Sequence, residues 1–387
     1  MIRFIKSLLL GILYHLFVLR FLIIGAISQY NDTNNEITGG DDMGKAKIIS
    51  VINYKGGVGK TVSGFNIAAG LSFLNHNSVL LIDLDPQCSL STICMKAYSR
   101  SLGEYKRLSD IPEEETINHV FNTYLNQDIL DFNLEIEIDK LIKKEFYTGN
   151  KYRLKRLDFL PATMFMNSCQ GTIKGLEDIE TEIKRKYGDD SNSTLKRISL
   201  LAKFMNDTKL NELYDFIIFD CPPTNSYITQ NALFVSDYYL VPTIMDDMGV
   251  HGVHHVKNIV ENTILYECCC NYQKLIRLAP HTSYLSFLKT GVPKMLGIIE
   301  TLRKGSTTQD QLRQTVEMKF PGKLFDSIIH NQVDISRQIG AGECCFISTK
   351  KENKNPVNVA YGEIVFEILK RTGVEEHQYA RSVTESL

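Results

Sequence analysis

The sequence predicts an α/β fold of the doubly wound type, in which helices cover both faces of a mostly parallel sheet. Apolar runs of strand length alternate along the chain with stretches of helical spacing, which is the pattern of βα units. These runs are apolar throughout instead of alternating with polar residues, as expected of strands that are buried on both faces. Several runs end in glycine-rich or acidic segments, at the edge where open α/β sheets bind their ligands.

The first strand is predicted at residues 46–53 (AKIISVIN), and a helix with apolar spacing follows over residues 61–74. Between them stands the segment KGGVGKT. Strand, glycine-rich turn and helix in this order make a phosphate-binding loop, because the N–H groups of the turn and the positive end of the helix all face an anion. The residues predicted to contact the nucleotide are Lys55, Gly56, Gly57, Val58, Gly59, Lys60, Thr61 and Val62.

The two lysines of this loop have different predicted roles. Lys60 should reach the β- and γ-phosphates as a point charge, and the Thr61 hydroxyl should bind the Mg²⁺ held between these phosphates. Lys55 stands too early in the turn to repeat the role of Lys60. The loop therefore predicts a magnesium–nucleotide site with one lysine in excess.

Two further strands deliver carboxylates to the same edge of the predicted sheet. Residues 79–87 (VLLIDLDPQ) bring Asp83 and Asp85, and residues 216–223 (FIIFDCPP) bring Asp220. Taken singly, each segment could be a strand that ends in an acidic turn. Together and in this order, the three segments indicate a complete nucleotide site.

With these motifs the chain resembles the ParA/MinD class of ATPases, which have a deviant phosphate-binding loop, and most closely the ParA (Soj-like) partition ATPases. KGGVGKT alone also fits MinD-like proteins, anion-pump ATPases and the nitrogenase iron protein, whereas DLDPQ favours ParA. The resemblance spans residues 46–372. The other matching stretches are LPAT (160–163), YDFIIFDCPP (214–223), QNAL (230–233), LVPT (240–243) and GIIET (297–301).

The resemblance implies a homodimer that encloses two ATP molecules, with Lys55 of each subunit reaching the phosphates bound by the other. Lys60 and Asp85 would complete the catalytic set, with Asp85 orienting the attacking water. Hydrolysis would be slow and stimulated by a partner, and it would weaken the dimer. The implied partners are a ParB-like DNA-binding protein and nonspecific DNA.

The metal site is also implied by the resemblance. Thr61 would bind Mg²⁺ and Asp220 would hold the water shell of the metal. Asp83 would support this site without binding the metal directly. Val62 departs from the family pattern, which usually has Thr or Ser there, so one hydroxyl contact to the α-phosphate is expected to be missing.

Direct DNA binding is the weakest expectation, because Asn331 stands where the family usually has arginine in a stretch close to IPRN. A formal net charge of −2 excludes a chain that is basic throughout, although one basic face of a dimer would suffice. The cations that could form such a face are Arg303, Lys304, Arg313, Lys319, Lys323, Arg337, Lys350, Lys351 and Lys354.

Residues 1–42 form a separate N-terminal segment, and two interpretations of it stay open. Residues 8–28 are long and apolar enough to span a bilayer, apart from His15 and Arg20. The charges on either side would place the ATPase on the side of the membrane that lacks ATP. We therefore favour Met43 as the true start over a membrane anchor, and we expect a cytoplasmic, nucleoid-associated protein whose residues 43–387 form one ATPase domain.

An insertion is expected around residues 96–155, and its alternating segment FNLEIEI (132–138) predicts an inserted edge strand. Exposed loops are expected at residues 189–194 and 350–355. The remaining predicted elements are strands at 157–160 and 240–243, a helix at 249–270 and a final helix at 360–372.

Neither the cysteines nor the histidines favour a metal or redox function. The nine cysteines include the run Cys268, Cys269 and Cys270 but no C-x₂-C pair, so reduced thiols are expected. His251, His254 and His255 have the spacing of one helix face, yet they fall at an ordinary helix start.

The sequence thus favours a ParA-like ATPase that positions plasmid or chromosomal DNA. One alternative is a membrane-anchored MinD-like ATPase that positions a protein partner, with residues 8–28 as the anchor. The other is an ATP-dependent binding module with negligible turnover.

Overall fold

The computed structural model describes residues 46–130, 136–147, 154–164, 175–188, 193–262, 264, 293–346 and 356–381. The chain divides into two compact units, Met1–Lys45 and Ala46–Leu387, and the described residues all belong to the second. The proposed N-terminal anchor and the start at Met43 lie outside the described residues. The same holds for the cysteine run 268–270, most of the predicted loop 189–194 and all of the loop 350–355.

In the described residues, seven strands form one sheet, in which every neighbouring pair is parallel. The spatial order is β3-β2-β4-β1-β5-β6-β7. In chain order the strands are β1 (Lys47–Val51), β2 (Val79–Asp83), β3 (Leu157–Leu160), β4 (Phe216–Asp220), β5 (Tyr238–Thr243), β6 (Lys294–Arg303) and β7 (Leu324–His330). The predicted α/β fold is confirmed.

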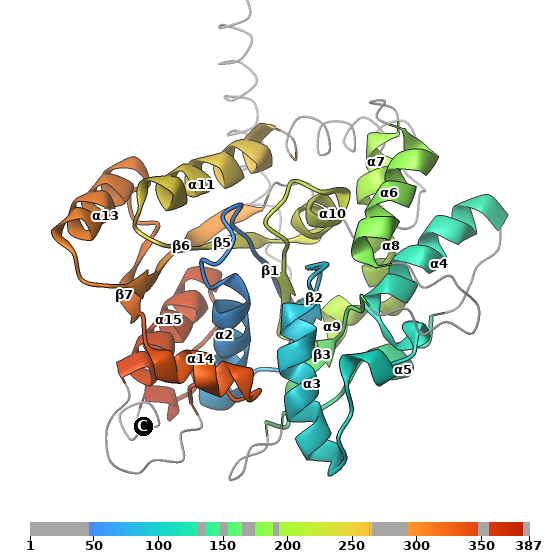
Figure 1. Ribbon diagram of the computed structural model, residues 1–387, viewed down its shortest axis with the longest axis horizontal. Coiled ribbons are helices and arrows are strands. Elements are labelled where there is room, and N and C mark those ends of the chain that lie inside the picture. The colour runs from blue at the N-terminus through green and yellow to red at the C-terminus, as the bar shows by residue number, and fades with distance from the viewer. Residues whose placement is uncertain are drawn as a thin grey trace, which may run out of the picture. The chain divides into compact units, whose positions relative to one another are not determined.

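Helices cover both faces of this sheet. Helices α10, α11 and α13 lie on one face, and α2, α3 and α15 lie on the other (Figure 1). The helices of the described residues are α2 (Lys60–Asn75), α3 (Ser89–Leu102), α4 (Ile117–Leu130), α5 (Ile138–Leu141), α6 (Leu176–Tyr187), α7 (Thr194–Ile198), α8 (Leu200–Thr208), α9 (Leu210–Leu213), α10 (Tyr227–Val235), α11 (Asp247–Asn258), α13 (Thr307–Lys319), α14 (Val333–Gly340) and α15 (Pro356–Thr372), with short 3₁₀ turns at Leu108–Asp110 and Glu113–Glu115.

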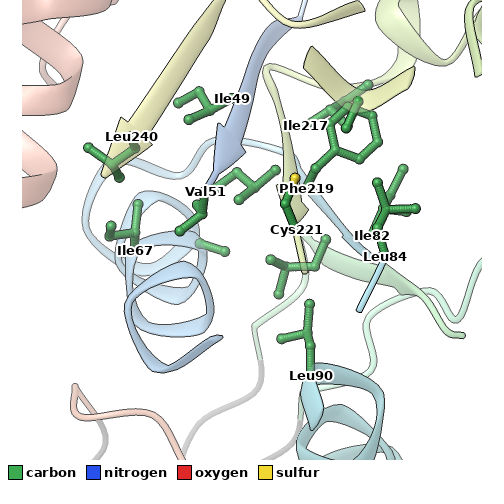
Figure 2. Packing of buried hydrophobic residues seen from close by; sticks show 14 of the residues in the cluster. Ile49, Val51, Ile67, Ile82, Leu84, Leu90, Ile217, Phe219, Cys221 and Leu240 are labelled. Carbon is green, nitrogen blue, oxygen red and sulfur yellow. The ribbon is translucent and has the colours of Figure 1, made fainter. Parts of the chain in front are cut away.

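The core forms because the central strands are apolar on both faces. Every residue of β2 and β4 is buried. Side chains of β1 and β4 pack between α2 on one side and the β2–α3 region on the other, as Figure 2 shows for Val51, Ile67 and Phe219. Each such side chain contributes about 1.5–3 kcal/mol when it is fully buried. The sheet is therefore a rigid platform for the loops at its carboxyl edge.

The order of the strands places one crossover point at β1 and β4. From β1 the chain passes through α2 to β2, whereas from β4 it passes through α10 to β5 in the opposite direction. Doubly wound sheets bind ligands at the point where the winding reverses. The strand ends meet there in register, because Val51 pairs with Asp220 and Asp220 pairs with Asp83.

One predicted strand is wrong where the structure describes it. Of the expected edge strand at residues 132–138, the last three are described, and Ile138 begins the short helix α5. The edge of β3 is met instead by Lys143, through an isolated antiparallel bridge to Phe159. Ile136 and Ile138, the described apolar residues of the alternation, are half-buried and pack against the core from this turn.

The two predicted C-terminal helices agree with the structure where they are described. The helix expected at residues 249–270 is present as α11, up to Asn258. The final helix begins at Pro356, four residues earlier than expected, and ends at Thr372 as predicted. None of the helices in the described ranges combines the length and the apolarity that crossing a bilayer demands.

Candidate nucleotide-binding site

The loop between β1 and α2 has the backbone of an anion-binding turn. Gly57 and Gly59 have φ of 70° and 80°, a region that only glycine enters without strain. A Cβ added to Gly56 or Gly57 would meet no atom within 4 Å, so the space beside these exposed glycines is open. Helix α2 begins at Lys60, directly after the turn, and directs its free N–H groups at the same place.

Two buried side chains, Thr301 on a distant strand and Asn53 just after β1, tie this loop to β5 and β6. Thr301 on β6 donates its hydroxyl toward the carbonyls of Val58 (2.8 Å) and Thr243 (3.1 Å). Asn53 accepts the N–H of Lys55 at 3.0 Å and donates to the Pro242 carbonyl at 2.8 Å. Because β5 and β6 anchor both ends of the turn, its N–H groups are fixed before a ligand arrives. No role was predicted for Asn53 or Thr301 from the sequence.

The ammonium group of Lys60 lies inside the loop. Its Nζ is 3.4 Å from the Lys55 carbonyl, and the residue is 7% exposed. Burial lowers the pKa of Lys60, and the nearby carboxylates of Asp220 and Asp85 act against that shift. Lys60 therefore lies within the electrostatic influence of Asp220 and Asp85.

Asp220 is the most unusual group of the site. Both of its carboxylate oxygens are buried, and neither has a hydrogen-bond partner of good geometry within the described residues. Burial, followed by the charge of Asp83, raises the pKa of Asp220 well above its ordinary value, while Thr61 and Lys60 act in the opposite direction. Buried oxygens without partners are rare in folded proteins. A hard cation with its water shell would satisfy them.

The residues present therefore fit a magnesium ion bound together with a nucleotide. Thr61 offers a hydroxyl and Asp220 offers oxygens, which are the donors that Mg²⁺ prefers. In the described part of the chain, no three His, Cys, Asp or Glu side chains converge to hold a metal alone. Most ligands of the ion would accordingly come from phosphate and water, as is usual for Mg²⁺ at nucleotide sites.

Asp83 holds the segment that carries Asp85. One oxygen of Asp83 accepts the N–H and the hydroxyl of Ser91, both at 2.7 Å, and the other accepts the N–H of Asp85 at 3.1 Å. Burial raises the pKa of Asp83 to about 6. Asp85 in turn accepts the N–H of Gln87 at 2.9 Å. Asp83 was predicted to assist the metal, and the structure adds that it fixes the turn before α3.

The second lysine of the loop does not point at its own phosphate site. Lys55 forms an ion pair with Asp246, whose side chain is 44% exposed. Asp246 also caps α11 by accepting the N–H of Gly249 at 2.7 Å. Burial raises the pKa of Asp246, but Lys55 and the Gly249 N–H outweigh this effect and leave it below the ordinary value. Nothing in the sequence analysis singled out Asp246.

Three of the cations considered for DNA contact make contacts within the protein itself. Glu300 is fully buried, and its carboxylate binds Arg303 at 2.6 Å and Arg313 at 2.9 Å. Arg303 also pairs with Asp310. The Lys323 ammonium donates to the Met295 carbonyl at 3.1 Å.

The other members of that set remain at the surface or outside the described residues. Lys304, Lys319, Arg337 and Asn331 are exposed. The three lysines at positions 350, 351 and 354 lie outside the described residues. A basic face on this chain would therefore have fewer members than the sequence suggested.

The histidines and the thiol near the site have packing roles. The His255 ring meets the Tyr54 ring edge-on at 4.5 Å, and His254 stacks obliquely on Phe320 at 4.8 Å. Burial raises the pKa of the Cys221 thiol, which lies fully buried after Asp220.

Comparison with known proteins agrees with this geometry. Residues 46–268 match the family model described as AAA domain. The virulence plasmid ParA family protein of Chlamydia psittaci is 23% identical over 308 residues, which are 80% of this chain and 95% of that protein. The sporulation initiation inhibitor protein Soj of Bacillus subtilis is 27% identical over 215 residues, or 55% of this chain and 64% of Soj.

A solved structure shows the same fold. The complex of Cyanothece McdA with ATP has a TM-score of 0.54 and 17% identity, and the match covers 86% of this chain and 99% of that one. At this identity the likeness concerns the fold.

Proposed function

Since this chain belongs to the AAA domain family, and within it to the ParA-like partition ATPases, we propose that it is an ATP-driven switch that closes as a homodimer and opens after hydrolysis. One observation carries the proposal. Lys60, Thr61 and the unpartnered Asp220 meet at one sheet edge. Lys55 is not part of this group and forms an ion pair with Asp246.

The chain's own groups suffice to bind ATP with its metal. The fixed N–H groups of the turn and the start of α2 would hold the β-phosphate, and Lys60 would neutralise the β- and γ-oxygens. Thr61 and Asp220 would hold Mg²⁺, which supplies charge neutralisation between the phosphates. Val62 offers no hydroxyl to the α-phosphate, so backbone N–H groups would bind the α-phosphate.

Hydrolysis would depend mainly on positioning. Asp85 is the candidate for orienting the attacking water, because Asp83 fixes its backbone beside Lys60. Phosphoryl transfer needs placement and charge neutralisation more than covalent help, so few side chains are required. Without a second cation at the γ-phosphate, turnover by a single subunit should be slow.

Lys55 would supply that cation to the partner subunit. Its ion pair with Asp246 is partly exposed, and such pairs contribute only about 0–1 kcal/mol. A triphosphate carries several negative charges and can compete for the ammonium group. The pair with Asp246 therefore supports a resting position from which Lys55 is released when two ATP-bound subunits meet.

We propose further that the switch acts in partition of plasmid or chromosomal DNA, in the cytoplasm, through a ParB-like DNA-binding partner. Contact through a partner is favoured over direct binding because Arg303 and Arg313 are engaged with Glu300, and because Asn331 replaces the usual arginine. Nonspecific DNA binding would have to rely on Lys304, Lys319 and Arg337, among others.

Phosphate release by the purified protein tests this function. Wild type should release phosphate slowly with ATP and Mg²⁺, and Lys60→Ala should abolish the release. Lys257→Ala, which removes a surface lysine of α11 paired with Glu261, is the matched control and should behave as wild type. Activity that survives in Lys60→Ala would contradict the proposed site.

The same assay separates the alternatives. A measurable basal rate argues against a binding module with negligible turnover. Comparing the rates with and without DNA, and with and without a candidate DNA-binding partner, tells direct contact from contact through the partner.

A further inference from the structure

Helix α10 follows directly on the Asp220 loop, and its first turn is capped by a different helix. Glu180 of α6 accepts the N–H of Tyr227 at 2.7 Å through one carboxylate oxygen and the N–H of Ile228 at 3.1 Å through the other. The hydroxyl of Ser226 accepts the N–H of Thr229 at 3.1 Å. A helix start leaves such donors without an intrahelical acceptor. Here one distant carboxylate supplies two of the three acceptors.

The loop that leads from Asp220 is folded back onto this same turn. The Thr229 hydroxyl donates to the Thr224 carbonyl at 2.9 Å. The Gln230 amide donates to the Asn225 side chain at 3.0 Å. Residues 221–226 therefore take their conformation partly from the first turn of α10. If that turn unwinds, the loop loses the contacts that shape it.

The helices outside α10 hold it in place by other contacts as well. Helix α10 lies beside α6 and α7 (Figure 1). Asn231 of α10 donates to the Arg197 carbonyl at 2.7 Å and accepts the N–H of Leu201 at 3.1 Å. The Arg197 guanidinium lies 5.2 Å from the centre of the Tyr227 ring. Helix α10 would therefore stay packed against the neighbouring helices without Glu180, whose carboxylate acts specifically on the start of α10.

We propose that Glu180 is a positioning residue for hydrolysis. By fixing the start of α10, it sets the loop of residues 221–226 and thereby the metal side of the site next to Asp220. The inference rests on the proposed ATPase function. Its physical basis is that a small misplacement at a reacting centre can slow the reaction by about a hundredfold, even when the misplaced group lies far from the chemistry. Burial raises the pKa of Glu180, and its two backbone hydrogen bonds oppose that shift.

The test compares Glu180→Ala and Glu180→Gln with two controls on the same helix. Glu177→Ala removes an equal charge at an exposed position, and Ile183→Ala weakens the buried face of α6. Glu180→Ala should lower kcat for phosphate release by about tenfold, the order expected for loss of a helix cap. The dissociation constant of a fluorescent ATP analogue should change less than about twofold. Glu180→Gln keeps one acceptor oxygen and should recover part of the rate.

The melting temperatures separate a positioning role of Glu180 from a purely structural one. If Glu180 positions the site, Ile183→Ala should lower the melting temperature more than Glu180→Ala does, yet retain more of the wild-type kcat. Glu177→Ala should match wild type in both. If Ile183→Ala and Glu180→Ala lose kcat in proportion to their loss of melting temperature, the positioning role is refuted.

Hydrogen–deuterium exchange provides a readout that does not need turnover. Amides of residues 224–231 should exchange faster in Glu180→Ala than in wild type or Glu177→Ala, and an unchanged exchange rate contradicts the inference. Should Glu180→Ala not fold, Glu180→Gln is subjected to the same two measurements. A wild type without phosphate release defeats the proposed function and this inference together. Wild-type turnover with an unaffected Glu180→Ala kcat defeats this inference alone.

Discussion

Replacing Asp246 by asparagine should strengthen ATP-dependent dimerisation. Asparagine keeps an oxygen that can accept the N–H of Gly249, so the cap of α11 survives, while the ion pair with Lys55 is lost. In the proposed function, that pair holds Lys55 in its own subunit and competes with its insertion into the partner's site. Removing the competitor favours the closed state.

The size of the effect follows from the exposure of the pair. Lys55 is 26% exposed and Asp246 is 44% exposed, so solvent screening limits the pair to about 0.2–1 kcal/mol. Two such pairs open for each dimer, which gives about 0.4–2 kcal/mol, or roughly a two- to thirtyfold tighter dimer. The effect should shrink at high salt because the pair lies near the surface.

The dimer dissociation constant can be measured by sedimentation with a nonhydrolysable ATP analogue and Mg²⁺. Asp247→Asn is the matched control, because it removes the same charge from the next, exposed residue of α11. A dimer of Asp246→Asn that is no tighter than that of Asp247→Asn would refute the account of the pair as a resting position. A weaker dimer would show that Asp246 contributes to the closed state instead.

Three other predictions concern the fixed parts of the site and the core. Thr301→Val removes the hydroxyl that holds the Val58 carbonyl, so ATP affinity measured by fluorescence should fall by about fivefold or more, the loss that one hydrogen bond of about 1 kcal/mol implies. Because the pKa of Asp83 is raised to about 6, its ionisation costs stability, so the free energy of unfolding should decrease from about pH 4 to about pH 6. Urea titrations of Asp83→Asn should lack this part of the decrease with pH, and the same decrease in the variant as in wild type would contradict the assignment. Gly70→Ala would bring a Cβ to 2.7 Å from the Val365 side chain, so urea unfolding should show a loss of about 1–3 kcal/mol, whereas Gly340→Ala, with open space around it, should show little change.

The nucleotide loop could be predicted from sequence because its chemistry is local. The glycines, Lys60 and Thr61 act within seven consecutive residues, and the flanking strand and helix follow from apolar spacing. Asp83 and Asp220 were found for a related reason, since parallel strands end at one edge and an acid after an apolar run marks that edge. Local patterns and one rule of topology therefore account for the centre of the site.

The supports of the site could not be predicted, because they come from distant parts of the chain. Asp246 meets Lys55 across 191 positions, and Thr301 meets Val58 across 243. A polar residue at a strand end or a helix start has many structural uses. Only the packed sheet shows which loop such a residue faces.

Charge and short alternations were misleading for similar reasons. Arg303 and Arg313 counted as free cations in the sequence, whereas a buried Glu300 binds both. The alternation that ends at Ile138 fits a strand as well as a helical turn, because a few apolar residues can be buried by either.

The most direct test of the whole account is the mass of Asp85→Ala, in which hydrolysis should be blocked, measured by light scattering with saturating ATP and Mg²⁺. We expect a mass twice the 44.0 kDa of one chain, and a return to the mass of one chain when ATP is replaced by ADP. A protein that stays at the mass of a single chain in ATP would contradict the proposal that two subunits exchange Lys55 across a shared nucleotide interface.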